Sequence, residues 1–244
     1  MKIMKFEQIV KNISSIFSGV LIFLMAATFY MSAKGFEINE NGDIVLVKQA
    51  MAVEQDDQPK EIPLNYVFPQ DHFVGSVDAP VVLYEYSSFG CFHCADFHLD
   101  VLPDIQREYV EKGLVKLVFV PLPLDKNSMD AALLAECVEK DKYFAFVDVL
   151  FKKQNDWGMA FNPQKVLLQY AALSGLGNEE ALACLKNDAN ATQILTNRQA
   201  GLTDLGIKGT PTFIVSSKHD NEVVAGLKTY DEFKSIIDAH LAKK

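Results

Sequence analysis

Two cysteines with a histidine between them are the residues of this chain best suited to chemistry. Cys91 and Cys94 enclose Phe92 and His93, which gives a Cys-x-x-Cys motif. A cysteine that ionises becomes a nucleophile, and two cysteines at this spacing form a disulfide that exchanges with other thiols. The same spacing occurs in zinc ribbons, so the flanking segments must decide between these chemistries.

The flanking segments place the motif between a strand and a helix. The run from Val81 to Tyr86 is apolar, with β-branched and aromatic residues, as in a strand. Apolar residues recur at every fourth position from Phe97 to Ile105, which indicates an amphipathic helix. Cys91 therefore lies at the start of a helix, where unpaired N–H groups and the helix dipole favour a thiolate. A protonated His93 favours it further. We expect Cys94, one turn into the helix, to be more buried and less acidic.

A second segment, Gly206–Val215, contains Gly209-Thr210-Pro211 immediately before an apolar run. A strand preceded by Gly-Thr-Pro is where a cis X-Pro bond would lie. Read alone, Thr210-Pro211 is also consistent with a simple turn into an edge strand.

Together, the sequences YEYSSFGCFHC and GIKGTPTFIV resemble the thioredoxin superfamily, and more closely its DsbA-like branch, the bacterial thiol:disulfide oxidoreductases. The resemblance covers residues 71–244. It implies an α/β, thioredoxin-like fold with an all-helical insertion at about residues 125–195. The order of elements that the sequence patterns predict, β-α-β, a helical block and then β-β-α, agrees with it.

The remaining patterns predict where those elements lie. Strands are expected at 44–47, 114–122 and 222–224, and helices at 127–154, 164–173, 178–186, 189–205 and 229–241. Pro103 should kink or interrupt the active-site helix. Trp157 and Asn162-Pro163 are expected to end the long helical pattern, and Thr229 is a candidate N-cap.

The cysteine motif and the resemblance together give roles to four residues. Cys91 would attack a disulfide and form a mixed disulfide that Cys94 resolves. His93 would stabilise the Cys91 thiolate and so make the disulfide more oxidising. Glu85, in the strand before the motif, is either exposed at a sheet edge or a buried proton acceptor beneath the cysteines. DsbA-like proteins carry a glutamate here, which favours the second interpretation and a role in shuttling the proton of Cys94.

Substrate contacts are expected from three residues. By resemblance, Thr210 and Pro211 form a cis-proline loop whose backbone would hydrogen-bond an extended client segment. Phe92 stands where DsbA has proline, so it lacks the fixed φ of proline and adds an exposed aromatic ring. It would line a shallow apolar surface for unfolded clients.

Cys137 and Cys184 lie in the expected helical block and suggest a second pair. A structural disulfide, a redox relay and two reduced buried thiols are the alternatives, and we favour the structural disulfide. Two disulfides suit an oxidising compartment.

Composition narrows the class of protein. A chain of 244 residues with 49% hydrophobic content can bury a substantial core without needing cysteines to fold. The net charge of −9, without a basic stripe, argues against nucleic-acid binding.

The N-terminus suggests export. Residues 1–33 combine three lysines near the start with an uncharged apolar run at 13–33, and are expected to be a signal peptide or a membrane anchor. Residues 34–70 are expected to be a linker, and residues 71–244 the folded domain. The predicted location is the periplasm.

The resulting hypothesis is an exported oxidoreductase that donates its Cys91–Cys94 disulfide to folding secreted proteins. The resemblance implies reoxidation by a DsbB-like membrane quinone reductase, and no cofactor is needed because the cysteines carry the electrons. A periplasmic isomerase or reductase is one alternative. A non-catalytic metal-binding or assembly module is the other: Cys91, Cys94 and His98 have ligand-like spacing, but no fourth ligand is evident, and we predict no metal site.

Overall fold

The computed structural model describes residues 36–38, 44–46, 61–70 and 72–243. Strand β1 (Phe36–Ile38) pairs antiparallel with β2 (Ile44–Leu46), which agrees with the strand expected at 44–47. The expected signal or anchor, residues 1–33, lies outside the described residues. Within the part that is described, no helix is long and apolar enough to cross a membrane.

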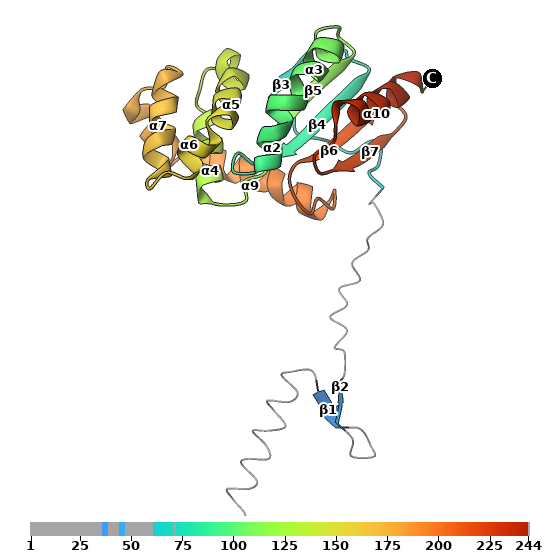
Figure 1. Cartoon of the computed structure of the whole chain (residues 1–244), viewed down its shortest axis with the longest axis horizontal. Coiled ribbons are helices and arrows are strands. Elements are labelled where there is room, and N and C mark those ends of the chain that lie inside the picture. The colour runs from blue at the N-terminus through green and yellow to red at the C-terminus, as the bar shows by residue number, and fades with distance from the viewer. Residues whose placement is uncertain (1–35, 39–43, 47–60, 71, 244) are drawn as a thin grey trace, which may run out of the picture. The chain divides into compact units, whose positions relative to one another are not determined.

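A five-stranded mixed sheet is the centre of the larger unit, residues 59–244 (Figure 1). Its order is β3-β5-β4-β6-β7. The strands are β3 (Phe73–Val74), β4 (Val81–Ser87), β5 (Val115–Pro121), β6 (Thr212–Ser217) and β7 (Asn221–Ala225). β4 pairs parallel with β5 and antiparallel with β6, so it occupies the middle of the sheet and is buried on both faces.

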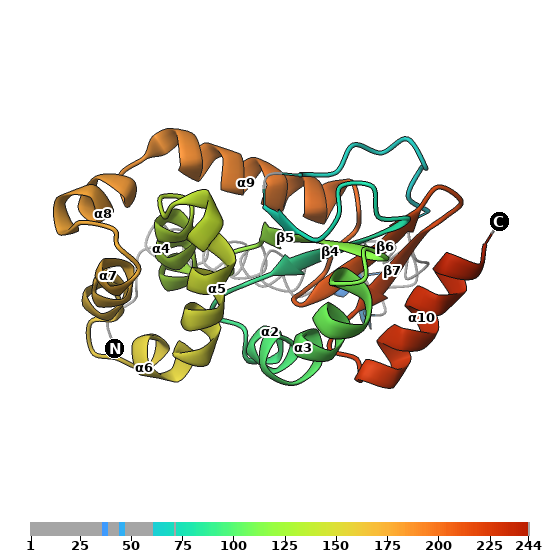
Figure 2. The same cartoon turned by 90° about the horizontal axis from the view of Figure 1, so that it is seen from above.

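Helices cover both faces of the sheet (Figure 2). The segments α2 (Phe92–Asp96) and α3 (Leu102–Ile105), with α10 (Tyr230–Ala242), cover one face and pack on Val81 and Leu83. The other face, with Tyr84 and Tyr86, is covered by residues that lie after helix α9 (Asp188–Thr203) and by residues 62–68. Successive strand residues point to opposite faces, so one seven-residue strand supplies both cores.

Residues 62–68 belong to the packed domain, which corrects the expected linker of residues 34–70. Ile62 and Phe68 are 8% and 7% exposed, and the Phe68 ring stacks on Tyr84 with 4.3 Å between centroids. The packed chain therefore begins before residue 71.

The helix that follows the cysteines is segmented. A π-helical turn, Phe97–Val101, separates α2 from α3, and a second one, Gln106–Val110, follows α3. Pro103 has no N–H and its ring crowds the carbonyl four residues earlier, and a wider turn relieves that conflict. The predicted interruption therefore lies just before Pro103, within the first π-helical turn.

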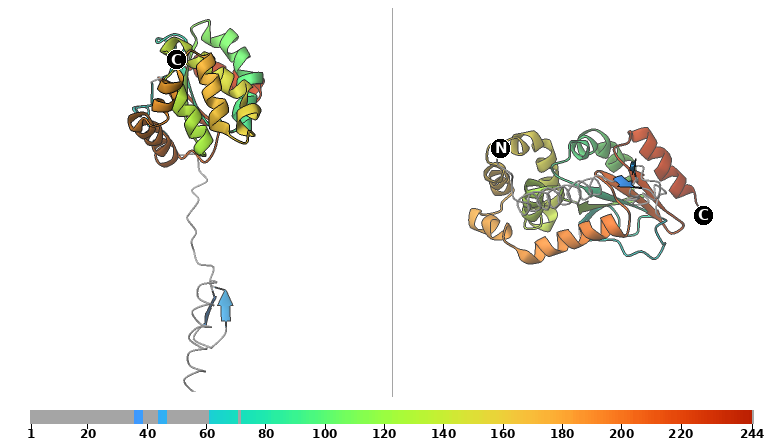
Figure 3. Two further views of the ribbon diagram at one scale, coloured as in Figure 1. Left: turned by 90° about the vertical axis from the view of Figure 1, so that its left-hand side faces the viewer. Right: turned by 90° about the horizontal axis from the view of Figure 1, so that it is seen from below.

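The insertion is entirely helical between β5 and the loop before β6 (Figure 3). It contains α4 (Lys126–Ala135), α5 (Tyr143–Lys152), α6 (Gln154–Gly158), α7 (Pro163–Leu173), α8 (Asn178–Cys184) and α9. Trp157 was expected to break the helical pattern, but it lies inside α6. It is buried there because its indole Nε1 donates to Leu150 O at 2.8 Å. The predicted α/β fold with an inserted helical block is confirmed.

Candidate active site

The two cysteines lie where the central strand passes into the first helix. Cys91 is the N-cap of α2, with extended backbone angles of φ −84° and ψ 121°. Both cysteines are free thiols. Cys91 is half-buried, whereas Cys94, one turn on, is fully buried. Their placement follows the expectation from the sequence.

The loop that carries Cys91 is held from the helical insertion. The buried Gln154 of α6 donates through Nε2 to Phe89 O at 2.7 Å and to Cys91 O at 2.9 Å. At Gly90, a Cβ atom would lie 2.5 Å from Ser128 Oγ at the start of α4, so only glycine fits there. The sequence analysis missed Gln154, because nothing local distinguishes a glutamine that bonds a loop 63 residues away.

The surroundings of Cys91 favour its thiolate. The pKa of Cys91 is lowered to about 6, first by the hydrogen bond from the Cys94 thiol, against the opposing effect of burial. The Thr210 hydroxyl and the backbone N–H groups of Cys94 and His93 lower it further. Of these groups, neither the two amides nor the hydroxyl makes a hydrogen bond of regular geometry to the sulfur. Their dipoles still act across a half-buried site, so we rely on the direction of the pKa change.

Cys94 has the opposite character. Burial is the main cause of its raised pKa, and the neighbouring Cys91 sulfur raises it further. The Ser87 hydroxyl and the Ser88 amide act in the other direction without reversing it. At neutral pH the reduced pair therefore holds one accessible thiolate and one buried thiol.

The Gly-Thr-Pro segment faces this pair. The Thr210–Pro211 peptide bond is cis. The Cys91 thiol donates to Thr210 O at 3.3 Å, although the two residues are 119 positions apart in sequence. The Pro211 segment leads directly into β6, the neighbour of β4, which is why it meets the cysteine loop.

His93 approaches Cys91 through its backbone rather than its ring. The side chain is 70% exposed, and its Nδ1 lies 3.3 Å from Asp96 Oδ2. The ring effect that the sequence predicts stays a prediction, because the group that faces the sulfur here is the His93 amide. Phe92 is 58% exposed, and the nearby Leu99 is 43% exposed.

Glu85 is buried in the middle of the sheet, so of the two expected placements the exposed edge is excluded. Its side chain is 0% exposed and is paired with His98, whose side chain is 1% exposed. His98 was considered in the sequence only as a metal ligand. Among the residues that the structure describes, no group of three or more His, Cys, Asp or Glu side chains is placed to hold a metal ion.

Cys137 and Cys184 form a disulfide that joins the end of α4 to the end of α8. Cys184 is buried at 3% exposure, and the Asn190 side chain approaches Cys137 Sγ at 3.9 Å. The pair lies within the helical insertion, apart from the Cys91 loop.

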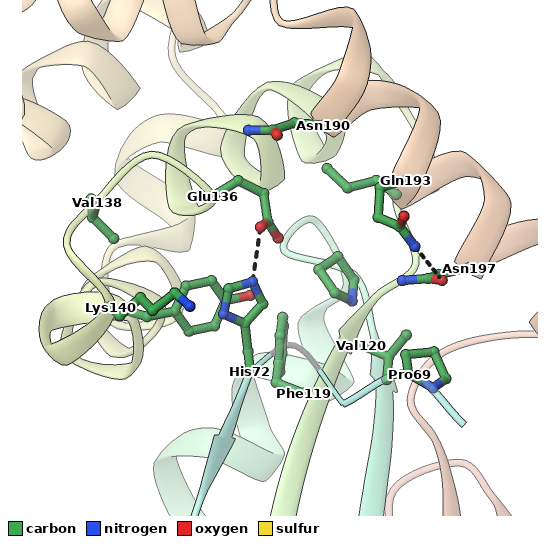
Figure 4. Close-up of a pocket in the computed structure, with 13 residues that line it drawn as sticks. Pro69, His72, Phe119, Val120, Glu136, Val138, Lys140, Asn190, Gln193 and Asn197 are labelled. Atoms are coloured by element: carbon green, nitrogen blue, oxygen red, sulfur yellow. Dashed lines mark hydrogen bonds and ion pairs between the residues drawn. The ribbon is translucent and has the colours of Figure 1, made fainter. Parts of the chain in front are cut away.

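A cavity of about 270 Å³ lies between the end of β5 and helix α9 (Figure 4). His72 Nε2 and Glu136 Oε2 are 2.8 Å apart beside it, and the His72 ring stacks on Tyr143. Neither Cys91, Cys94 nor Pro211 lines this cavity, so it is not the place where the thiols react.

A pair of thiols whose acidities are driven apart, at a helix start and opposite a cis-proline, is arranged for exchange with disulfides of other molecules. The fold and the site therefore define the chain as a protein thiol:disulfide oxidoreductase.

Comparison with known proteins gives the family. The model of the thioredoxin family matches residues 68–239, so the chain belongs to that family. It is 32% identical over 177 residues to disulfide bond formation protein D of Bacillus subtilis, covering 70% of this chain and 77% of the relative. It is 26% identical over 194 residues to a putative protein-disulfide oxidoreductase of Rickettsia bellii, covering 76% of this chain and 75% of the relative.

A solved structure agrees with this relationship. The crystal structure of alpha-DsbA1 from Wolbachia pipientis superposes with a TM-score of 0.66 at 28% identity, covering 72% of this chain and 93% of the other. The chain is a DsbA-like thiol:disulfide oxidoreductase.

Proposed function

We propose that this protein donates its Cys91–Cys94 disulfide to proteins that fold after export. The observation that carries the proposal is the lowered pKa of Cys91, about 6, beside the raised pKa of Cys94. A stabilised thiolate stabilises the reduced form, so the disulfide gives up its bond readily and acts as an oxidant.

The proposed reaction has two exchanges. A client thiolate attacks Cys91 Sγ, the Cys91–Cys94 bond breaks, and its electron pair leaves on the Cys94 sulfur, which takes up a proton. A second client thiolate then attacks the client sulfur and releases Cys91 as a thiolate, which its low pKa makes a good leaving group. The client is oxidised by two electrons and the enzyme pair is reduced.

Client binding is assigned to the groups around Cys91. The Thr210 and Pro211 backbone would hydrogen-bond an extended client segment, and the exposed Phe92 would contact its apolar side chains. His93 would stabilise the thiolate when protonated, and Glu85 would handle the proton of Cys94. The Cys137–Cys184 pair would serve as a structural disulfide.

The cellular setting is part of the proposal. Residues 1–33 would export the protein to the periplasm or anchor it in the inner membrane, with the segment before Ile62 as a spacer. A DsbB-like membrane quinone reductase would restore the disulfide. The printed name of the Bacillus relative, a disulfide bond formation protein, supports the direction of the reaction.

Redox titration against glutathione buffers tests the proposal. We expect a potential clearly more oxidising than the roughly −270 mV of a reducing thioredoxin, together with net oxidation of a reduced client peptide. Cys91→Ser should reduce that oxidation to the background rate. Cys94→Ser should keep the first exchange and trap a mixed disulfide. A potential near that of thioredoxin, with no net oxidation, would instead indicate a reductase or isomerase.

A further inference from the structure

A buried ion pair lies one helical turn beyond the cysteines and has no part in the chemistry assigned so far. His98 Nε2 lies 3.1 Å from both carboxylate oxygens of Glu85. Phe151 stacks on the imidazole at 4.2 Å, and the Phe119 ring lies against its edge at 5.9 Å. A buried pair of this kind costs desolvation and is seldom more stabilising than apolar residues of similar volume, so stability alone is a weak reason for it.

The pair is in line with Cys94. Glu85 and Ser87 alternate onto the same face of β4, and Cys94 and His98 are four residues apart on the helix that covers this face. The Ser87 hydroxyl lies close enough to Cys94 to lower its pKa, while Glu85 contacts His98. Ser87 Oγ is buried and has no hydrogen bond of regular geometry, so it is available to pass a proton between the two levels.

The other side of the imidazole leads toward solvent. His98 Nδ1 lies 3.7 Å from Asp148 Oδ1 on α5, and the Asp148 side chain is 44% exposed. Glu85 from β4 and Asp148 from α5 are the charged groups that face His98, and the other contacts on its ring are the aromatic ones given above.

The electrostatics agree with this geometry. Burial would lower the pKa of His98, but the charge of Glu85 and the contacts with Asp148 outweigh it and raise the pKa to about 9. At neutral pH the ring is therefore a cation that holds a proton between a buried carboxylate and an exposed one.

We propose that His98 is a positioning residue for Cys94, which holds Glu85 in place and carries protons between that carboxylate and Asp148 at the surface. This rests on the proposed thiol–disulfide exchange. When a client displaces Cys94, the buried sulfur receives a proton from Glu85 through Ser87. Glu85 regains it from His98, and His98 regains one from solvent at Asp148. Reoxidation moves the proton out along the same groups as Cys94 forms its bond to Cys91.

The test isolates the step in which Cys94 must lose its proton. The full chain is prepared with Cys91 in a mixed disulfide with glutathione, and attack by Cys94, which releases glutathione, is followed by rapid quench from pH 5 to 9. His98→Gln keeps a hydrogen-bond donor for Glu85 but carries no proton. We expect release at pH 7 to slow by about tenfold to a hundredfold, the lower range for acid–base assistance. The rate should then rise more steeply with pH than in the wild type.

Asp148→Asn is the second variant, and its half-exposed position makes it unlikely to disturb folding. It should change the pH profile in the same direction by a smaller factor. The exposed Asp156→Asn on the neighbouring helix α6 is the matched control and should leave the profile unchanged.

Two outcomes would overturn the proposal. In one, His98→Gln lowers the unfolding midpoint but leaves the pH profile of glutathione release as in the wild type, which is the result for a purely structural ion pair. In the other, His98→Gln does not fold and the Asp148→Asn profile matches that of Asp156→Asn. Because this assay needs only the exchange between Cys91 and Cys94, a reducing potential would remove the proposed oxidase function without deciding this result.

Discussion

The two cysteine pairs of this protein lie in different regions and have opposite surroundings. Cys91 and Cys94 are three positions apart at a strand–helix junction of the sheet domain, as free thiols. Cys137 and Cys184 are 47 positions apart in the helical insertion, and they are joined. One pair is near in sequence and poised for exchange, and the other is distant in sequence and bonded.

The difference shows that what surrounds the sulfurs decides their use. At the first pair, free helix amides and a hydrogen bond from Cys94 stabilise a charged sulfur that is half open to solvent. At the second, Cys184 is almost fully buried among helices, where a partner thiol has little access. Reactivity of a disulfide requires both an acidic thiol and access, and the described geometry gives these to the first pair.

The largest expected effect comes from removing the bonded pair. Cys137→Ala with Cys184→Ala opens a loop whose ends are 47 positions apart, so the free energy of unfolding should fall by up to about 4 kcal/mol on the loop-entropy model. Urea denaturation measures this loss.

The comparison predicts that the same double variant keeps the exchange chemistry. The pH midpoint for alkylation of Cys91 should match that of the wild type, because no group that lowers the pKa of Cys91 has been changed. If the midpoint moved by more than a few tenths of a pH unit, the two pairs would be coupled and the distinction drawn here would fail.

The next effect is the acidity of Cys91. Alkylation of the reduced protein by iodoacetamide should show a midpoint near pH 6. An ordinary thiol has a pKa of about 8.5, so at pH 6 Cys91 should hold roughly a hundredfold more thiolate. Cys94 should remain unmodified until the protein unfolds, since it is buried and its pKa is raised.

The sign of the linked stability change follows from the same pKa. The folded pKa of Cys91 lies below the unfolded value, so the contribution to the stability of the reduced protein is complete above the unfolded pKa. It is lost as the pH falls toward and below about 6. Urea denaturation of the reduced protein between pH 5 and 9 would contradict this sign if the Cys91 contribution, isolated with Cys91→Ser, increased toward acid.

The smallest of these effects concerns the contact between the two regions. Gln154→Ala removes the donor to the carbonyls of Phe89 and Cys91, so two buried acceptors lose their partner. We expect a loss of about 1–3 kcal/mol in the free energy of unfolding. A modest slowing of client oxidation should accompany it, because the Cys91 loop is less firmly held.

Gln169→Ala, at an exposed position of helix α7, is the matched control. If it destabilised the protein as much as Gln154→Ala, loss of a glutamine from a helix would explain both results, and the insertion would not be holding the active-site loop.

Local patterns were sufficient for much of the fold. The alternation of Val81–Tyr86, the fourfold apolar spacing after Cys94 and the capping residue Thr229 are short-range features that the physics of strands and helices makes readable. The Thr229 hydroxyl and Glu232 form the expected cap of α10, and β5 and β7 lie within a residue or two of the predicted ranges. Trp157 was misjudged because its indole is satisfied by a carbonyl within its own helical hairpin, a contact that no spacing rule indicates.

The sequence by itself determined the reactive motif, the order of elements and the position of Cys91 at a helix start, because these depend on neighbours along the chain. Only the tertiary structure decided that Thr210 faces Cys91, that Gln154 holds the Cys91 loop and that His98 pairs with Glu85. Those contacts depend on which strands are adjacent and how the insertion packs, and burial, which sets the acidity of Cys94 and His98, exists only once the chain has folded.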